Sequence, residues 1–188
     1  KSTGATASPF ARTGIFLSLG KRGQMEFQIG DPVVHCTYGM GKVMDVEERV
    51  YNQTTTKYYK VQVIDFTIWV PADENLKSRL RLPASVSGFK KLLSILAAPA
   101  ENLPKDRRER NTLLQERMKN GAVDSLCKVI RDLAYFRRDK SWSEYDSALM
   151  KRAQKALIGE WIFILSVTPE QAEIELAKLL AQKTGATK

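Results

Sequence analysis

Few residues in this sequence have the types and spacing that catalysis or metal binding requires. The chain has 188 residues but only one histidine, His35, and its two cysteines, Cys36 and Cys127, have no further ligand at metal-binding spacing. Carboxylates are numerous, yet none stands in a recognisable catalytic motif, and neither G-x-S-x-G nor H-E-x-x-H occurs. We therefore expect a protein that is not an enzyme and that holds neither a metal nor a cofactor.

One glycine-rich stretch, Gly39–Lys42, has the G-x-G-K pattern of half a phosphate loop. A complete phosphate loop continues with Ser or Thr and leads into a helix whose N-terminal amides point at the phosphates. Here Lys42 is followed by Val43–Val46, which alternates like a strand. We interpret the stretch as a turn that reverses one strand into the next, with the glycines supplying positive φ.

The net charge of +9 is distributed unevenly along the chain. Residues 1–24 carry a net charge of +4, residues 25–83 carry −1 and residues 84–188 carry +6. A basic half beside a neutral half indicates that the C-terminal part meets a polyanion while the other part meets something else. The alternative for the basic half is a solvated helical surface.

The first 24 residues are rich in Ser, Thr, Gly and Ala, lack acidic residues and show no hydrophobic period, so we expect them to be disordered. Their composition resembles an organellar transit peptide. Because a strand-like run follows Met25 at once, we favour the alternative that translation starts there. No run of about 18 apolar residues occurs, and the cysteines form no disulfide framework, so we expect a cytoplasmic protein without a membrane span.

From Phe27 to about Leu82 the sequence predicts short strands. Four runs are rich in β-branched and aromatic residues and are bounded by turn residues: 32–36, 41–50, 57–63 and 66–71. The stretch Asn52–Thr56 predicts a polar hairpin loop. About 55 residues are too few for two packed sheets, so we expect a small, strongly bent barrel of the SH3 or Tudor kind as a first domain over residues 25–83.

After Leu82 the apolar residues recur at helical spacing, with proline and glycine at the expected boundaries. Five helices are predicted: 86–97, 104–120, 123–138, about 144–165, and one that opens at 168–171. The loops between them are short, which predicts a compact bundle as a second domain over residues 84–183, followed by a tail at 184–188. The fold class is therefore α+β.

Several motifs, in this order along the chain, carry a resemblance to a known family. They are FQIGDPVV at 27–34, YGMG at 38–41, WVP at 69–71, VIRDL at 129–133 and AQKALIGE at 153–160. Over residues 25–181 the chain resembles the CarD/CdnL family of bacterial transcription regulators. Its strand-rich half also resembles the RNA polymerase-interacting domain of the transcription-repair coupling factor.

The resemblance implies a non-enzymatic regulator that binds the β subunit of bacterial RNA polymerase through the barrel. In the family, the binding surface includes the strand that leads into the Val-Pro and a basic residue on the second strand. By position these are Arg49, Thr67, Ile68, Trp69 and Val70. An exposed edge strand can pair with a strand of a partner, and Trp69 would then be an interface anchor. Many relatives carry a basic residue at the position of Trp69. The alternative is a tryptophan that serves only the barrel core.

The resemblance also implies that the helical domain contacts promoter DNA at the upstream edge of the melted bubble and stabilises the open complex. The family's motif there is a tryptophan followed by paired arginines. Arg107 and Arg108 supply the arginines, whereas Lys105, Asp106 or Arg107 occupies the place of the tryptophan, which acts as an apolar wedge in the family. The candidate DNA-binding residues are Lys105, Arg107, Arg108, Arg110, Arg137, Arg138, Lys140, Lys151 and Arg152.

Two alternative functions stay open. Without the wedge tryptophan, the chain could be a polymerase-binding adaptor with weak or no bubble-stabilising activity. It could also be a small-barrel protein that binds RNA or the ribosome, which predicts basic and aromatic residues on the barrel face. The neutral charge of residues 25–83 favours a protein partner for the barrel and nucleic acid for the helices. We expect a monomer.

Overall fold

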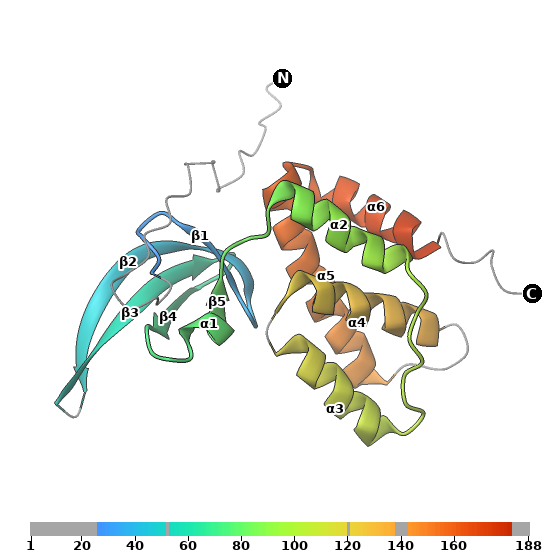
Figure 1. Ribbon diagram of the computed structural model, residues 1–188, viewed down its shortest axis with the longest axis horizontal. Helices are drawn as coiled ribbons and strands as arrows, with labels where there is room; N and C mark the ends of the chain where they lie inside the picture. Colours follow the sequence, from blue (N-terminus) through green and yellow to red (C-terminus); the bar gives the residue numbers. More distant parts are fainter. Residues whose placement is uncertain (1–25, 52, 120, 138–142, 182–188) are drawn as a thin grey trace, which may run out of the picture. The chain divides into compact units, whose positions relative to one another are not determined.

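The computed structural model describes residues 26–51, 53–119, 121–137 and 143–181 (Figure 1). The predicted leader, residues 1–24, and the predicted tail, residues 184–188, lie outside the described residues. By their internal contacts the residues form two compact units. One comprises the described residues 26–32 and 41–76, and the other comprises 33–40 together with the described residues from Lys77 onward.

Five strands form one antiparallel sheet in the order β4-β3-β2-β1-β5. The strands are β1 (Pro32–His35), β2 (Gly39–Tyr51), β3 (Thr54–Val63), β4 (Thr67–Pro71) and β5 (Leu80–Arg81). A one-turn helix, α1 (Leu76–Arg79), precedes β5 and was not predicted. Among the described residues β4 and β5 do not pair, so the sheet is open. The α+β class is confirmed, but the predicted barrel is not, because closure depends on pairing between distant strands that local alternation does not specify.

The β2–β3 hairpin is longer and tighter than the sequence predicted. The two strands stay paired from Gly41 opposite Val63 to Tyr51 opposite Thr54, with a bulge between Val43 and Asp45. Most of the predicted polar loop is therefore strand. Threonine tolerates this because its β-branched side chain suits a pleated surface.

Two glycines at the start of β2 have different roles. Gly39 has a φ of +77° and provides the predicted turn. Gly41 lies within β2, where a Cβ atom would come within 2.8 Å of the Gln62 carbonyl oxygen and of Val61 Cγ1 on β3. The prediction that both glycines supply positive φ is thus wrong for Gly41, which is required by close approach of two strands. Lys42 continues the strand, so no phosphate loop forms.

Side chains along β2, β3 and β4 alternate between two faces of the sheet, as the period of two demands. One face supplies buried apolar residues, and the opposite face carries polar, charged and aromatic residues. The buried set is Val43, Tyr59, Val61, Val63 and Val70. The opposite set includes Glu47, Arg49, Tyr58, Lys60 and Trp69, which the strand register brings side by side.

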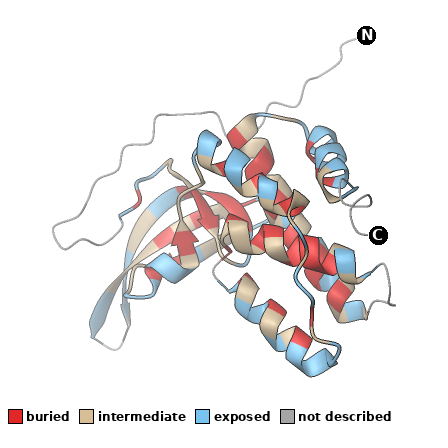
Figure 2. Ribbon diagram, turned by 45° about the vertical axis from the view of Figure 1, so that its right-hand side comes forward, coloured by how far each residue is buried: buried red, intermediate tan, exposed pale blue. Residues whose placement is uncertain are grey.

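Five longer helices follow β5, close to the predicted bounds. They are α2 (Val86–Ala97), α3 (Arg107–Met118), α4 (Val123–Phe136), α5 (Glu144–Leu165) and α6 (Pro169–Ala181). Helix α4 packs against α2, α3 and α5, while α6 packs against α2 and α5. Figure 2 shows that the buried residues gather on the sides of the helices that face one another. In the part of the chain that the structure describes, no helix is both long and apolar enough to cross a membrane.

Side-chain caps mark the starts of several helices. Ser143 caps α5 in a capping box with Asp146. At α6, which was expected to open at 168–171, Thr168 Oγ1 accepts from the Gln171 amide at 3.2 Å. For α3 the predicted start, at residue 104, lies three residues before the observed one. Asp106 caps the helix by accepting from two backbone amides, so Pro104 lies before the first turn instead of within it.

Candidate functional sites

Arg49 and Trp69, the two side chains expected at a polymerase surface, meet on the polar face of the sheet. The Arg49 guanidinium lies 5.1 Å from the Trp69 ring centroid and 5.6 Å from that of Tyr58. Lys60, which is directly opposite Trp69 in the register, places Nζ 5.8 Å from the same tryptophan ring. Trp69 is 41% exposed and is not among the buried core residues, which argues against a tryptophan that serves only the core of the sheet domain.

Glu47 holds this arrangement together. Its Oε2 accepts from Arg49 Nε at 3.2 Å and from Nη2 at 2.8 Å, and its Oε1 accepts from the Trp69 indole N–H at 3.4 Å. The hydrogen bonds from Arg49, and then that from Trp69, lower the pKa of the Glu47 carboxyl below its ordinary value. We call the five residues Glu47, Arg49, Tyr58, Lys60 and Trp69 the aromatic–cation cluster.

Sequence reasoning missed three members of this cluster, Glu47, Tyr58 and Lys60. The available signal was the alternation itself, because Glu47 and Arg49 are two residues apart on one strand and therefore share a face. Their meeting with Trp69 additionally requires the register of β2, β3 and β4. That register is not visible in any single strand.

The other residues expected at this surface lie along β4 beside Trp69. Val70 is buried and faces the core, so only its backbone can meet a partner. Thr67 is half-buried and donates its hydroxyl hydrogen to Gln62 Oε1 at 2.6 Å, and Ile68 is also half-buried. Among the described strands, β4 has β3 as its one neighbour. An edge strand of this kind is a template for a further strand.

On the helical side, the basic residues expected to bind DNA have two different environments. Lys105, Arg107 and Arg108 are exposed around the start of α3, and Arg137 is exposed at the end of α4. Lys151 and Arg152 are exposed on α5, while Arg138 and Lys140 lie outside the described residues. We call the four residues Lys105, Arg107, Arg108 and Arg137 the basic helix-end surface.

Arg110 differs from its neighbours because it is only 6% exposed. Its guanidinium pairs with the Asp146 carboxylate, with Nε to Oδ1 at 3.4 Å and Nη2 to Oδ2 at 3.3 Å. The sequence contained a signal for this burial, since Arg110, Leu114 and Met118 recur every four residues and all three are buried. The structure thus places this candidate DNA-binding residue in the interior, apart from its exposed neighbours Arg107 and Arg108.

The VIRDL motif has a structural role. Asp132 is fully buried and accepts from Arg131 Nε at 2.7 Å and from Arg117 Nη1 at 2.7 Å. Glu101 joins the same network through both arginines. The charge of Arg117, followed by its hydrogen bond, lowers the pKa of the Glu101 carboxyl. A buried carboxylate with two arginine partners is satisfied, so the motif fixes the segment before α3 against α4.

The AQKALIGE motif ends in Glu160, which is also fully buried. Its oxygens accept from Arg81 Nη1 at 2.9 Å, from Arg81 Nη2 at 2.6 Å and from the Ala84 backbone amide at 3.0 Å. Arg81 further donates to the Gly121 carbonyl at 2.8 Å. All of these residues belong to one compact unit, in which Glu160 fixes the segment that leads into α2.

The single histidine and the two cysteines lie in non-ligating environments. No group of three His, Cys, Asp or Glu side chains within the described ranges could hold a metal ion. His35 Nδ1 accepts from the backbone amides of Thr37 and Tyr38 at 3.0 and 3.3 Å, and burial followed by the charge of Arg79 lowers its pKa. Burial raises the pKa of the Cys127 thiol to about 12, so this side chain is neutral.

Comparison with known proteins gives matches over both parts of the chain. The family described as "CarD-like/TRCF RID domain" matches residues 27–81, and that described as "CarD, C-terminal domain" matches residues 91–177. The chain is also similar to the "Putative transcription factor YdeB" of Bacillus subtilis (strain 168). The two are 23% identical over 147 residues, which cover 77% of this chain and 96% of the relative.

Proposed function

The chain belongs to the CarD/CdnL family of bacterial transcription regulators, and from this premise we propose that it binds the β subunit of RNA polymerase with its sheet and promoter DNA with its helices. Polymerase binding is assigned to a domain over residues 25–83 and DNA binding to one over residues 84–183. The DNA contact lies at the upstream edge of the bubble and stabilises the open complex. In this proposal the chain acts as a cytoplasmic monomer without catalytic activity or cofactor.

The observation that carries the proposal is the aromatic–cation cluster beside an edge strand. A strand of the β subunit would add to β4 through main-chain hydrogen bonds, using the backbone of Thr67, Ile68 and Val70. Trp69 stands on the same strand with an exposed ring, and tryptophan and arginine are the side chains most enriched in interface hot spots. Glu47 keeps both Trp69 and Arg49 in one orientation, so less side-chain entropy is lost on binding.

The basic helix-end surface supports DNA binding. Lys105, Arg107 and Arg108 are exposed next to the N-terminus of α3, where lysine, arginine and backbone amides all favour phosphate. Contacts of this kind read the backbone and not the base sequence. Lys151 and Arg152 on α5 are exposed as well and are the next candidates. The expected contacts of Arg138 and Lys140 stay predictions.

The missing wedge tryptophan motivates the adaptor as a second candidate. The positions that could take its place are Lys105, Asp106 and Arg107, all exposed and none apolar, and Asp106 is occupied as the cap of α3. A wedge needs an apolar side chain that can enter a base step. The chain would then bind DNA through charge alone and hold the bubble open for a shorter time than a relative with the wedge.

The polar face of the sheet also bears on the RNA-binding alternative, because it carries two aromatic rings and two cations. RNA-binding sheets use exposed rings to stack bases. Here both cations lie against the rings, and Glu47 neutralises Arg49. This arrangement leaves less ring surface and less positive charge for RNA, and it favours a protein partner.

The deciding measurement is the lifetime of a bacterial RNA polymerase open complex after a competitor challenge, with and without this chain. We expect a longer lifetime with the chain and no extension with Trp69→Ala. The matched control is Ile174→Ala, which removes another exposed apolar side chain, on α6, and is expected to act like the unsubstituted chain. Binding to the β subunit without a longer lifetime favours the adaptor, and no binding to the β subunit overturns the proposal.

A further inference from the structure

We propose that Arg110 is a positioning residue that assembles the basic helix-end surface, and not a ligand of DNA phosphate. The inference rests on the proposed DNA binding and concerns how that surface is built. Lys105, Arg107 and Arg108 precede Arg110 in the sequence and are exposed. The side chain of Arg110 is buried in the bundle.

Arg110 connects several backbone groups in the segment that leads into its own helix. Its Nη1 donates to the backbone carbonyls of Pro104 at 3.1 Å and Lys105 at 3.2 Å, and reaches that of Asp106 at 3.5 Å. These carbonyls belong to the segment that enters α3, which has no regular secondary structure of its own up to Pro104. The guanidinium therefore fixes the backbone on which Lys105 stands and from which Arg107 and Arg108 start.

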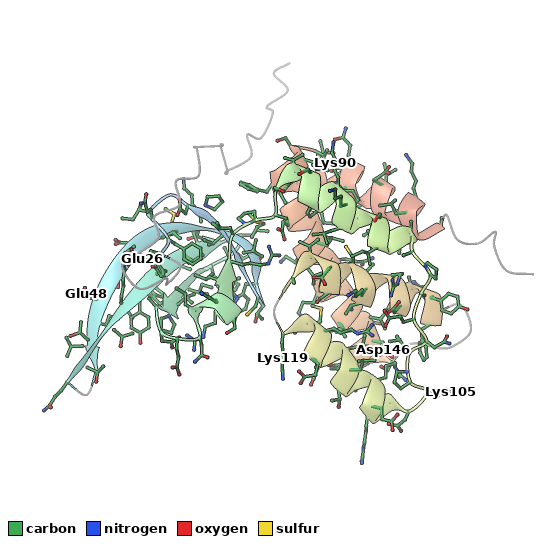
Figure 3. The ribbon with its side chains drawn as sticks, viewed as in Figure 1. Glu26, Glu48, Lys90, Lys105, Lys119 and Asp146 are labelled. Atoms are coloured by element: carbon green, nitrogen blue, oxygen red, sulfur yellow. The ribbon has the colours of Figure 1, made fainter. Side chains whose placement is uncertain are left out.

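Arg110 also reaches across the bundle. Asp146, its carboxylate partner, also accepts from the Ser143 hydroxyl at 2.8 Å and completes the capping box of α5. The guanidinium lies 4.7 Å from the ring centroid of Phe136, in the last turn of α4. One side chain thus joins the start of α3, the end of α4 and the start of α5. Figure 3 shows Lys105 and Asp146 at the same end of the helical part.

The consequence for binding follows from preorganisation. Arg137 follows Phe136 directly, so the Phe136 contact positions the fourth member of the surface. Charged side chains on a fixed backbone lose less conformational entropy when they meet phosphates than the same side chains on a loose segment. Arg110 contributes to DNA affinity through this fixed spacing, without touching DNA.

Arginine is required for this role by its donor geometry. The planar guanidinium offers five N–H donors, and here Nε, Nη1 and Nη2 all have acceptors. A lysine ammonium has three donors at a single point and cannot span the carboxylate and the carbonyls together. Arg110→Lys therefore keeps the positive charge but cannot make the hydrogen bonds to the Asp146 carboxylate and to the backbone carbonyls at the same time.

The test is Asp146→Asn, because the two possible roles of Arg110 predict opposite signs. The probe is a labelled DNA duplex with a short melted segment, and the measured quantity is the dissociation constant of the full chain. If Arg110 is a positioning residue, loss of its partner weakens binding by about tenfold. If Arg110 were a phosphate ligand, Asp146→Asn would release it and remove a nearby negative charge, and binding would become tighter.

Arg110→Lys provides the second measurement, together with the dependence of affinity on salt. A phosphate ligand would be largely rescued by lysine, whereas a positioning residue is not rescued and binding falls by about tenfold. The slope of log affinity against log salt distinguishes the two roles. It stays unchanged if Arg110 is a positioning residue, whereas loss of a phosphate contact by Arg110 would reduce it by about 0.9.

The matched control is Arg117→Lys, which alters a second arginine with a buried carboxylate partner, about 10 Å along α3 from Arg110. We expect unchanged DNA affinity for this variant. All variants are compared below their unfolding temperatures, which are measured by circular dichroism. Unchanged or tighter binding by Asp146→Asn overturns the inference alone. Absence of DNA binding by the unsubstituted chain overturns the proposed DNA contact, and the inference with it.

Discussion

Arg81 and Glu160 form a two-point ion pair, with Nη1 to Oε1 at 2.9 Å and Nη2 to Oε2 at 2.6 Å. The Glu160 side chain is fully buried, and the Arg81 side chain is 23% exposed. The parallel geometry of the two hydrogen bonds is specific to arginine and carboxylate. Glu160 is the last residue of the AQKALIGE motif, and this position of the motif has an architectural role.

Glu160→Ala is expected to destabilise the fold by about 3 kcal/mol, because removing one partner leaves the other charge without compensation. The measurement is the free energy of unfolding from urea titration followed by circular dichroism. Lys119→Ala is the control, since Lys119 and its partner Glu116 are both largely exposed, and an exposed pair is worth at most about 1 kcal/mol. Equal effects of the two variants would contradict this role of Glu160.

The lowered pKa of Glu47 predicts how the aromatic–cation cluster responds to acid. A carboxyl whose pKa is lowered in the folded chain is charged at neutral pH, and its contribution is lost only as the pH falls through the lowered value. The Trp69 indole N–H resonance, which reports the hydrogen bond to Glu47, should stay constant between pH 8 and pH 5 and shift with a midpoint below 4.5. Glu47→Gln should abolish this titration, and a midpoint above 4.5 would contradict the geometry.

Reversal of the charges at Arg107 and Arg108 is expected to weaken DNA binding and to reduce its salt dependence. Each phosphate contact contributes about 0.9 to the slope of log affinity against log salt, so loss of two contacts reduces the slope by about 1.8. The measurement is a titration of labelled duplex at several salt concentrations. Lys90→Glu with Lys91→Glu on α2 is the control, because it changes the net charge equally at exposed positions outside the basic helix-end surface. If both double variants reduce the slope equally, the salt dependence reflects the net charge of the chain and not phosphate contacts by Arg107 and Arg108.

The two cysteines are expected to differ in reactivity towards iodoacetamide. The Cys127 thiol is fully buried and its pKa is raised to about 12, first by burial and then by Asp124 and Glu160. The thiolate is the reactive form, so Cys127 should remain unmodified in the folded chain at pH 8. Cys36 is half-buried and should be modified first, as read by mass spectrometry of the peptides. Modification of both cysteines at equal rates would indicate that the core around Cys127 opens readily.

The residues that could be located from the sequence are those whose position follows from local periodicity or from a cap. Trp69 on a strand, the start of α5 and the opening of α6 are of this kind. Glu47 was missed because its partners come from β2 and β4, and their juxtaposition depends on strand register. The open sheet was missed for the same reason, since closure depends on contacts between strands far apart in the sequence.

Arg110 illustrates a different limit. Arg110 shares a helix face with Leu114 and Met118, because the three recur every four residues, and this face is the buried one. The spacing was visible in the sequence, but an arginine is rarely buried without a partner. The partner, Asp146, lies on another helix, and the sequence alone does not show that the two meet.

The edge strand β4 has a further consequence for the chain in a crowded cell. A strand with a neighbour on one side is a site where identical chains can stack into fibrils. Lys60 on this face places Nζ 5.8 Å from the Trp69 ring of β4, so two copies that approached through their β4 edges would bring the positive charges of their two Lys60 side chains toward one another. This side chain would thereby oppose association between identical chains.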